Sequence, residues 1–482
     1  MPYSRPRLCL SLLATGLSLW LGGCAVTAVA PPPLVSASIA FKEGAVWQRS
    51  SATATVPDAW WALFQDPLLD ELQRRLIVGN EGLRGAAAQV TSARAVLESS
   101  RSAMFPTLSA GLAGTRSASP ASGEAGIAQK PSNSLSLSGT ATWEFDLWGR
   151  LAQASAAAND SLQASSADLA SARLSAQALL TQSYLSLRTA DAQLALLERS
   201  VAAYQRSLEL TQLRYDAGVA ARTDVLQGQT QVQSAQAQLA DMTAQRAQLE
   251  HAVAVLLGLP PSGLTIERSA QLPAAPEVPE LLPATLLQRR PDIAAAQHRV
   301  AAAYAQIGAA DAAFFPAVNL SANAGYRNSS LANLVSAPDL FWSMGSSLAQ
   351  AIFDGGARKL ASAQACASAE QATSSYRQTV LTALQEVEDN LVLARQLQAE
   401  AQFQSGALQA AQRNLEITLN QYRAGTVSYV NVVLAQTSAL SSESSLLAVR
   451  NRQLAAVNQL LKNTAGGWQA NEAGAQAAVT KP

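Results

Sequence analysis

The chain of 482 residues carries 34 Lys and Arg against 34 Asp and Glu, so its formal net charge at pH 7 is zero. That balance gives no reason to expect nucleic acid or another polyanion as a partner. Charged residues make up only 14% of the sequence, below the usual share of a globular domain, and Ala, Ser, Gln and Leu take their place.

The N-terminal segment resembles the signal of a bacterial lipoprotein. Two arginines precede an apolar stretch, Leu8 to Trp20, that is too short to span a bilayer. Leu21-Gly22-Gly23-Cys24 follows and resembles a lipobox, so residues 1–23 are expected to be removed and Cys24 to carry lipid, palmitate included. Ala25, in place of an aspartate, fits passage to the outer membrane. The alternative is an ordinary signal peptide with an incidental cysteine.

The mature chain is expected to begin with an extended tether at 24–58, which is rich in Pro, Ala and Ser. No later run of about 18 apolar residues occurs, so no transmembrane helix is predicted. Helical spacing of apolar residues predicts a helix from near Trp60 through Leu76, and a second from about Gly82 to Ala103. The second helix should stop at Phe105-Pro106, because proline cannot continue the hydrogen-bond ladder.

A change of period then predicts a β-hairpin at about 107–147. Leu108, Ala110 and Leu112 alternate with polar or small residues, and the same alternation runs through 134–145 after a Ser/Pro/Gly loop. Strands of this length match the apolar band of an outer membrane, and aromatic residues gather near their ends. Two soluble hairpins are the alternative.

The longest helical pattern follows, from Leu151 to about Tyr215, and would extend about 100 Å as one helix. It should end at Gly218, which suits a left-handed C-terminal position. Thr223 or Asp224 is expected to cap a partner helix that reaches Gly258. These elements make up a first repeat, 59–259.

A Pro-rich linker at 260–283 separates this half from a second repeat, 284–465, and a flexible tail is expected at 466–482. In the second repeat a helix opens at Arg289 to Ile293, where Pro291 suits the first turn. A hairpin at about 317–353 follows, its last strand running from Leu340 to Phe353. Helices at 358–423 and 431–461 flank a turn at Ala424-Gly425.

The second half therefore repeats the first. Ala103-Met104-Phe105-Pro106 returns as Ala313 to Pro316, Phe145 to Arg150 as Phe353 to Arg358, and Tyr215 to Gly218 as Tyr422 to Gly425, at an offset of about 208 residues. One chain supplies only four strands, whereas closed transmembrane sheets need about eight. Copies must therefore combine, to eight, twelve or more strands, and helical pillars below them would complete a conduit.

These features, with Trp60-Trp61 and Asp66-Pro67, make the chain similar to the TolC-like outer membrane factors, in the lipid-anchored branch typified by NodT and OprM. The resemblance implies an α+β membrane protein with an internal two-fold repeat. It further implies a homotrimeric, twelve-stranded outer-membrane β-barrel, four strands per chain, continuous with a long periplasmic α-helical barrel. A periplasmic adaptor and an inner-membrane transporter of the resistance-nodulation-division class would be its partners, and the channel would conduct drugs or other small molecules passively.

The resemblance also implies a periplasmic gate at the two helical turns, where Asp224 would bridge to Tyr422, assisted by Arg423 and Arg222. Asp224 has a second interpretation, a helix N-cap alone. Asn431 and Leu434 stand where relatives often place aspartates, so a cation-selective constriction is in doubt.

Adaptor docking is expected at the tips of the same turns, at Gly218, Thr223 and Gly425.

No enzyme, cofactor or metal site is predicted. His251 and His298, the two histidines, each lack a metal-ligand companion three or four residues away, and no phosphate-binding or nucleophile motif occurs. Two other functions remain open: a type I-like secretion conduit for peptides or proteins, and a structural coiled-coil lipoprotein.

Overall fold

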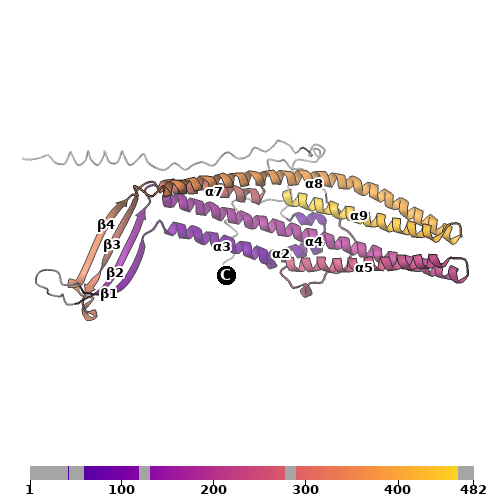
Figure 1. The fold of residues 1–482 in the computed structure, drawn as a ribbon, viewed down its shortest axis with the longest axis horizontal. Helices are drawn as coiled ribbons and strands as arrows, with labels where there is room; N and C mark the ends of the chain where they lie inside the picture. The colour runs from indigo at the N-terminus through magenta and orange to yellow at the C-terminus, as the bar shows by residue number, and fades with distance from the viewer. Residues whose placement is uncertain (1–41, 43–58, 119–130, 277–288, 465–482) are drawn as a thin grey trace, which may run out of the picture. The chain divides into compact units, whose positions relative to one another are not determined.

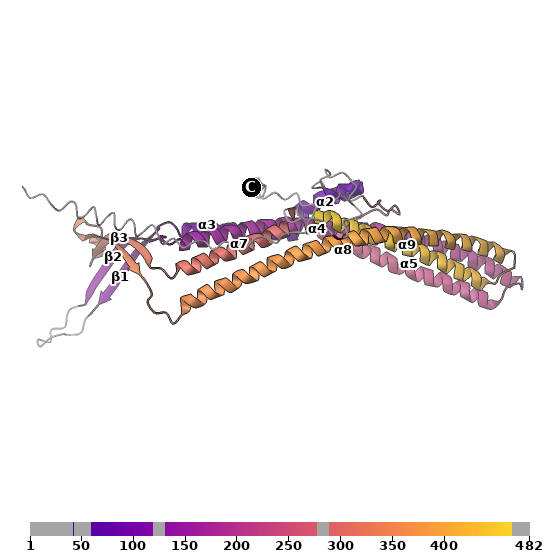
Figure 2. The same cartoon turned by 90° about the horizontal axis from the view of Figure 1, so that it is seen from above.

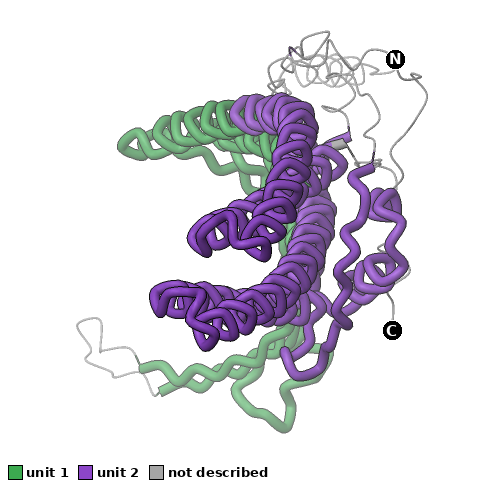
Figure 3. The backbone as a smooth tube through the Cα atoms, turned by 90° about the vertical axis from the view of Figure 1, so that its right-hand side faces the viewer, with its two compact units in different colours: residues 1–34, 89–165, 295–376 green, residues 35–88, 166–294, 377–482 purple. Residues whose placement is uncertain are grey.

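The computed structural model describes residues 42, 59–118, 131–276 and 289–464, which form two compact units (Figure 3). One unit comprises residues 1–34, 89–165 and 295–376, and the other comprises 35–88, 166–294 and 377–482. The expected signal, Cys24, nearly all of the tether, the C-terminal tail and part of the linker lie outside the described residues.

The first unit contains an antiparallel sheet in the order β1-β2-β3-β4 (Figure 1). Its strands are β1 (Thr107–Ser117), β2 (Ser132–Phe145), β3 (Ala317–Asn328) and β4 (Leu340–Ala349). β2 pairs with β3, so the central contact of the sheet joins the two halves of the sequence repeat. Within the described residues, β1 pairs only with β2 and β4 only with β3.

The last strand is shorter than the sequence predicted. β4 ends at Ala349 rather than at Phe353. Ala349 pairs with Ala317, the first residue of β3, and Pro316 precedes that residue. Because proline has no N–H to donate, β3 offers no further ladder partner, and the chain beyond Ala349 leaves the sheet.

The strands meet the helices at junctions held by tryptophans. Trp148 donates its indole N–H to the Pro316 carbonyl at 2.7 Å and stacks on Phe315 with ring centroids 4.9 Å apart. Trp143 donates to the Met104 carbonyl at 2.9 Å. The Phe-Pro segments at 105–106 and 315–316 are thus tied to the C-terminal end of β2, where α4 follows.

Helices α3 (Glu81–Ser102) and α7 (Pro291–Ala312) lead into β1 and β3, and α4 (Arg150–Asp216) and α8 (Ala357–Arg423) follow β2 and β4. Both 67-residue helices begin and end within one residue of the predicted positions. They contribute residues to both units. None of the described helices combines the length and hydropathy needed to cross a membrane.

In the second unit α5 (Arg222–Leu256) runs beside α4 and α9 (Tyr429–Thr464) beside α8 (Figures 1 and 2). The core of this unit collects apolar side chains from the 3-10 helix Trp60–Phe64, α2 (Pro67–Gly79), α4, α5, α8 and α9, including the fully buried Trp60, Leu72, Tyr184, Val253 and Leu461. A short 3-10 helix occurs in this unit at Pro261–Gly263, and two others lie in the first unit at Leu331–Asn333 and Ala337–Asp339.

The helix predicted from Trp60 through Leu76 is in fact two. A 3-10 helix at Trp60–Phe64 ends at Gln65, which has a left-handed φ of 54°. Asp66 is extended, as expected before proline, and its carboxylate accepts the backbone N–H groups of Leu68 and Leu69 at 3.0 and 3.3 Å. Asp66 therefore caps a new helix with Pro67 in its first turn.

Buried charges fix the segment 266–269 against α4 and α5. Asp191, whose side chain is 0% exposed, accepts from Arg246 at 3.0 Å, from Arg188 at 3.2 Å and from the Ser269 backbone N–H at 3.1 Å. Arg246 also donates to the Ile266 carbonyl at 2.5 Å. Every ion in this network has an opposite charge and a backbone partner, which offsets the cost of its burial.

We expect Arg246→Leu to lower the free energy of unfolding by about 3–5 kcal/mol, because it leaves the Asp191 carboxylate buried with one fewer cation. Urea unfolding of the detergent-extracted protein measures the change, and limited trypsin digestion reports release of segment 266–269. Arg452→Leu is the control: Arg452 and Glu400 form an exposed pair, with side chains 57% and 47% exposed, worth under about 1 kcal/mol. Equal losses in the two variants would contradict a structural role for the buried network.

Candidate functional site: the paired helical turns

The two helical hairpins of the second unit end in turns of one design. Gly218, after α4, has a φ of 74°, and Gly425, after α8, has a φ of 78°. Val219 N–H donates to the Arg214 carbonyl at 2.8 Å, and Thr426 N–H donates to the Gln421 carbonyl at 3.0 Å. These bonds close a helix C-terminus that requires a left-handed residue. The predicted glycine turns are confirmed.

The second turn is held by a buried pair of tyrosines. Tyr422, at the end of α8, is 4% exposed, and Tyr429, at the start of α9, is 1% exposed. Their ring centroids lie 5.4 Å apart at 57°, and both contact the fully buried Val432. The Tyr422 hydroxyl lies 3.2 Å from the Thr211 hydroxyl of α4. The ring pair therefore joins the α8–α9 turn to the first hairpin.

Arg214 of α4 makes a second connection to Tyr422. Its guanidinium carbon lies 4.7 Å from the centre of the Tyr422 ring, and Nη1 donates to the Tyr422 backbone carbonyl. The cation faces the electron-rich ring while it satisfies a carbonyl at the end of α8, where positive charge is favoured. The two hairpins are thus linked by packing, by a hydrogen bond and by charge.

Tyr429 fits into a notch left by a glycine on α5. A methyl group built on Gly228 would lie 3.0 Å from both the Tyr429 hydroxyl and Leu208 Cδ1. Burial raises the pKa of the Tyr429 phenol, and its hydrogen bonds to Ser207 and Thr211 oppose that rise in pKa. The site therefore keeps the phenol neutral and gives it partners on α4, with α5 close enough to hold it in place.

Asp224 takes neither of its two predicted roles within one chain. The N-cap prediction is wrong for both Thr223 and Asp224: α5 begins at Arg222, and its N-cap, Ala221, has no side-chain capping bond. Asp224 thus lies in the first turn, where its charge is still favourable. No Asp224–Tyr422 hydrogen bond forms among the described residues, because the Tyr422 hydroxyl faces Thr211. Asp224 instead acts electrostatically on Tyr429, helping to raise its pKa.

The remaining predicted residues lie on the surface of the turns. Arg222, Thr223 and Leu434 are exposed, Leu434 at 62%. Asn431 is exposed and donates to the Ser428 hydroxyl at 3.3 Å. Arg423 donates to the Asn420 side chain at 3.2 Å. A role for Arg222, Arg423, Asn431 and Leu434 in a gate between copies stays a prediction, as does a role for Thr223 in adaptor docking.

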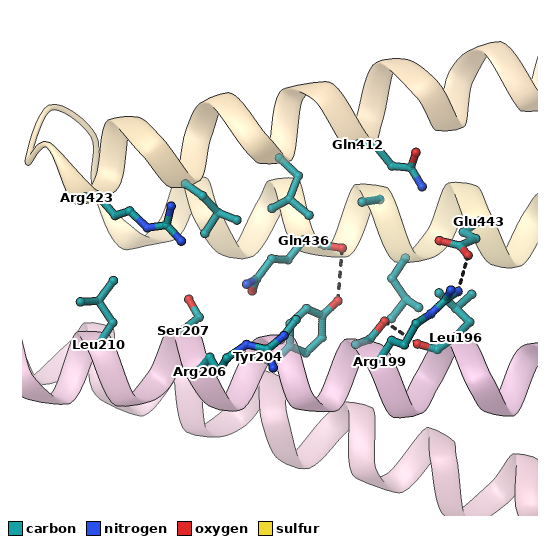
Figure 4. Close-up of a pocket in the computed structure, with 16 residues that line it drawn as sticks. Leu196, Arg199, Tyr204, Arg206, Ser207, Leu210, Gln412, Arg423, Gln436 and Glu443 are labelled. Carbon is teal, nitrogen blue, oxygen red and sulfur yellow. Dashed lines mark hydrogen bonds and ion pairs between the residues drawn. The ribbon is translucent and has the colours of Figure 1, made fainter.

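A cavity of about 400 Å³ lies between α4 and the α8–α9 hairpin (Figure 4). Leucines line it together with Arg199, Arg206 and Arg423. Tyr204 donates to the Gln436 carbonyl across it at 3.2 Å, and Arg199 pairs with Glu443 at 2.8 Å. At this level the two hairpins are bridged by these polar contacts and by an apolar cluster in which Leu440 of α9 packs with Val201 and Tyr204 of α4.

Sequence reasoning missed Thr211, Arg214, Gly228 and Tyr429. Tyr429 follows Tyr422 by seven residues across the turn, a spacing that could have suggested a pair. The residue of the first half that corresponds to Tyr429 is Arg222, so the internal repeat did not suggest a tyrosine pair. Among the described residues no group of three or more His, Cys, Asp or Glu side chains is placed to hold a metal ion.

Sequence comparison places the chain among known efflux proteins. The family model described as "Outer membrane efflux protein" matches residues 72–259 and 282–466. The toluene efflux pump outer membrane protein TtgC of Pseudomonas putida is 31% identical over 98% of this chain and 99% of its own. The pyoverdine export outer membrane protein OpmQ of Pseudomonas aeruginosa is 30% identical over 95% and 96%.

Solved structures of outer-membrane channels have the same fold as this chain. The outer-membrane channel OprN superposes with a TM-score of 0.84 at 28% identity, covering 92% of this chain and 100% of its own. The open state of the MtrE outer membrane channel of Neisseria gonorrhoeae gives a TM-score of 0.81 at 26% identity, with 92% and 98% covered.

We expect Gly228→Ala to destabilise the turns. The added methyl would crowd a tyrosine without room to move, at a cost of about 1–3 kcal/mol. The usual gain for alanine in a helix offsets roughly 0.5–1 kcal/mol of this. The control is Gly406→Ala in α8, where a methyl would meet nothing within 4 Å, so that change should stabilise. Circular dichroism during thermal unfolding measures the Tm of both variants. A rise of Tm in both would contradict the claim that Tyr429 needs the space left by Gly228.

Proposed function

The chain belongs to the outer membrane efflux protein family, and on that premise we propose that three copies form one continuous channel. The protein is an outer-membrane efflux component that extends into the periplasm, as its relatives and structural neighbours are. Each copy would contribute four strands to a twelve-stranded outer-membrane β-barrel, with the long helices forming a helical barrel below it. Cys24 would anchor each copy through lipid.

The observation that carries this proposal is the sheet itself. It has four strands and two edges that lack partners among the described residues. Exposed strand edges cannot face lipid, because their N–H and C=O groups would be left without hydrogen bonds. A closed sheet made from several copies removes those edges, and the pseudo-repeated halves suit a ring.

The partners and cargo follow from the family. A periplasmic adaptor would dock on the turns, at Gly218, Thr223 and Gly425, and an inner-membrane transporter of the resistance-nodulation-division class would supply the energy. The channel would conduct passively. Relatives bear names that refer to toluene, antibiotics and pyoverdine, so we propose small organic molecules as the class of cargo.

We further propose that the turns form the periplasmic gate. Tyr422 and Tyr429 hold the second hairpin on the first, while Asp224, Arg222, Arg423, Asn431 and Leu434 would face the neighbouring copies around the aperture. Opening would require the α8–α9 turn to move away from Thr211 and Arg214 of α4. The contacts at stake are few, a hydroxyl pair and a guanidinium on a ring, each worth about 1 kcal/mol.

Single-channel recording in planar bilayers tests both proposals. We expect the wild-type protein to insert as a channel of low conductance. Asp224→Ala with Tyr422→Phe should raise that conductance, because Tyr422 loses its hydroxyl contact with Thr211 and the proposed contact of Asp224 with a neighbouring copy is lost. Tyr204→Phe is the matched control. It also removes a buried hydroxyl that bridges the hairpins, but at the cavity rather than at the turn.

A wild-type protein that forms no channel would contradict the proposed function. Unchanged conductance in the double variant, with a normal channel otherwise, would contradict only the gate.

A further inference from the structure

We propose that the cavity between α4 and the α8–α9 hairpin binds an amphiphilic anion that carries a hydrogen-bond donor beside its acid group. The ligand's three parts are inferred from three properties of the lining: apolar side chains, an excess of positive charge and a buried amide oxygen without a partner. The inference concerns contacts within one chain and goes beyond the proposed function, because it does not depend on the channel, the trimer or the gate.

Apolar side chains from all three helices line the cavity. They include Leu196 and Leu210 of α4, Leu415 and Leu419 of α8 and Leu440 of α9. The volume of about 400 Å³ is within the range of cavities that hold small organic ligands. An acyl chain placed against these leucines would be removed from water, which is favourable, so the body of the ligand is expected to be apolar.

The lining carries more positive than negative charge. Arg199, Arg206 and Arg423 contribute to it, and Glu443 is the only acidic side chain among the described residues that line it. Arg199 pairs with Glu443 at 2.8 Å, which leaves Arg206 and Arg423 without an acidic partner in the described lining. Arg423 donates to the neutral side chain of Asn420 at 3.2 Å. Two guanidinium groups from different helices therefore favour a carboxylate as the head of the ligand.

The third property is the side chain of Gln436 on α9. Gln436 is 3% exposed and lines the cavity (Figure 4). Its Oε1 atom has no hydrogen-bond partner among the described residues. A buried acceptor in this state is unfavourable, because it has lost its hydrogen bond to water without gaining another. A ligand that brings an N–H or O–H group would satisfy it.

The hydroxyl groups of the lining are already engaged. The described lining has three of them. Tyr204 donates to the Gln436 backbone carbonyl at 3.2 Å, and Ser200 donates to a carbonyl of its own helix at 2.9 Å. Ser207 forms a hydrogen bond with the Tyr429 phenol. Because a hydroxyl has a single proton to donate, the donor for Gln436 Oε1 is expected to come from the ligand.

The three properties are arranged in an order that one molecule can follow. Figure 4 shows Arg423 and Leu210 toward one end of the cavity, Arg199 and Glu443 toward the other, and Gln436 between them. A carboxylate at the Arg423 end would place a neighbouring N–H near Gln436, and an acyl chain would continue along the leucines. N-acyl amino acids have this order of groups.

Binding of N-octanoylglycine tests the proposal. The full chain is placed in phosphatidylcholine nanodiscs and titrated by isothermal titration calorimetry, with nanodiscs that lack the protein as the baseline for partition into lipid. We expect saturable binding at one site per chain. Heat equal to that of the protein-free nanodiscs would overturn the proposal.

Two changes to the ligand test its polar groups in the unaltered protein. N-octanoylsarcosine has N-methyl in place of N–H, and the methyl ester of N-octanoylglycine lacks the negative charge. We expect each to bind at least about tenfold more weakly, because the first leaves Gln436 Oε1 without a donor and the second loses its pairing with the arginines. Equal affinity for all three ligands would overturn the proposed ligand class.

Variants then locate the site. Arg206→Gln should weaken binding of N-octanoylglycine at least about tenfold. Its matched control is Arg173→Gln, since Arg173 is an exposed residue of α4 that does not line the cavity, and this change should leave the affinity unaltered. Gln436→Leu should abolish the preference for N-octanoylglycine over N-octanoylsarcosine, an effect that a loss of stability alone would not produce.

Two results would place binding elsewhere and overturn the site. One is an equal effect of Arg206→Gln and Arg173→Gln on affinity. The other is an unchanged preference for the N–H ligand in Gln436→Leu.

Discussion

The whole structure depends on a deficit of hydrogen-bond partners at the two edges of a four-stranded sheet. Each chain pairs β1 through β4 in sequence and leaves one side of β1 and one side of β4 open among the described residues. In water such edges invite aggregation, and in lipid they are prohibitively costly. The proposed assembly, in which each chain supplies part of a larger closed sheet, would remove both edges.

The duplicated sequence offers one strand-pairing geometry that can be used both within a chain and between chains. The β2–β3 contact joins the two halves inside one chain, and the same geometry can be used again between chains. Trp143 and Trp148, at the C-terminal end of β2, tie the start of α4 to the segments that lead into β1 and β3. A duplication that solved the strand problem would thus have organised the helices as well.

The two halves have nonetheless diverged at their turns. In the second half Tyr422 and Tyr429 are both buried, whereas their counterparts Tyr215 and Arg222 are half-buried and exposed. Gly228 on α5 makes room for Tyr429, so the first half supplies the notch and the second half supplies the side chain that enters it. The proposed closure of the tip would therefore depend on contacts between the halves rather than on either hairpin alone.

The sequence predicted those features that depend on local pattern. The ends of α4, the glycines at 218 and 425 and the alternation of β2 all follow from periodicity and backbone preference. The predictions from sequence were wrong where residues distant along the chain, or a competing helix cap, determine where an element ends. β4 stops at Ala349 because β3 has no ladder partner before Ala317, and the Trp60 helix breaks because Asp66 caps its successor.

The site shows the same division. Glycine turns can be predicted from sequence, but Thr211 meets Tyr422 from 211 residues away, and no local spacing reveals such a pair. The resemblance supplied Tyr422 itself. It did not supply Tyr429, because the repeat places an arginine at the corresponding position.

The central claim is that the sheet closes only between copies, and native mass tests it most directly. The Cys24→Ala chain, carrying a cleavable signal so that no lipid anchors it, would be extracted from outer membranes and its protein mass measured by light scattering in detergent. The account predicts a protein that requires detergent for release and has three times the mass of one mature chain. A monomer released by salt alone would contradict it.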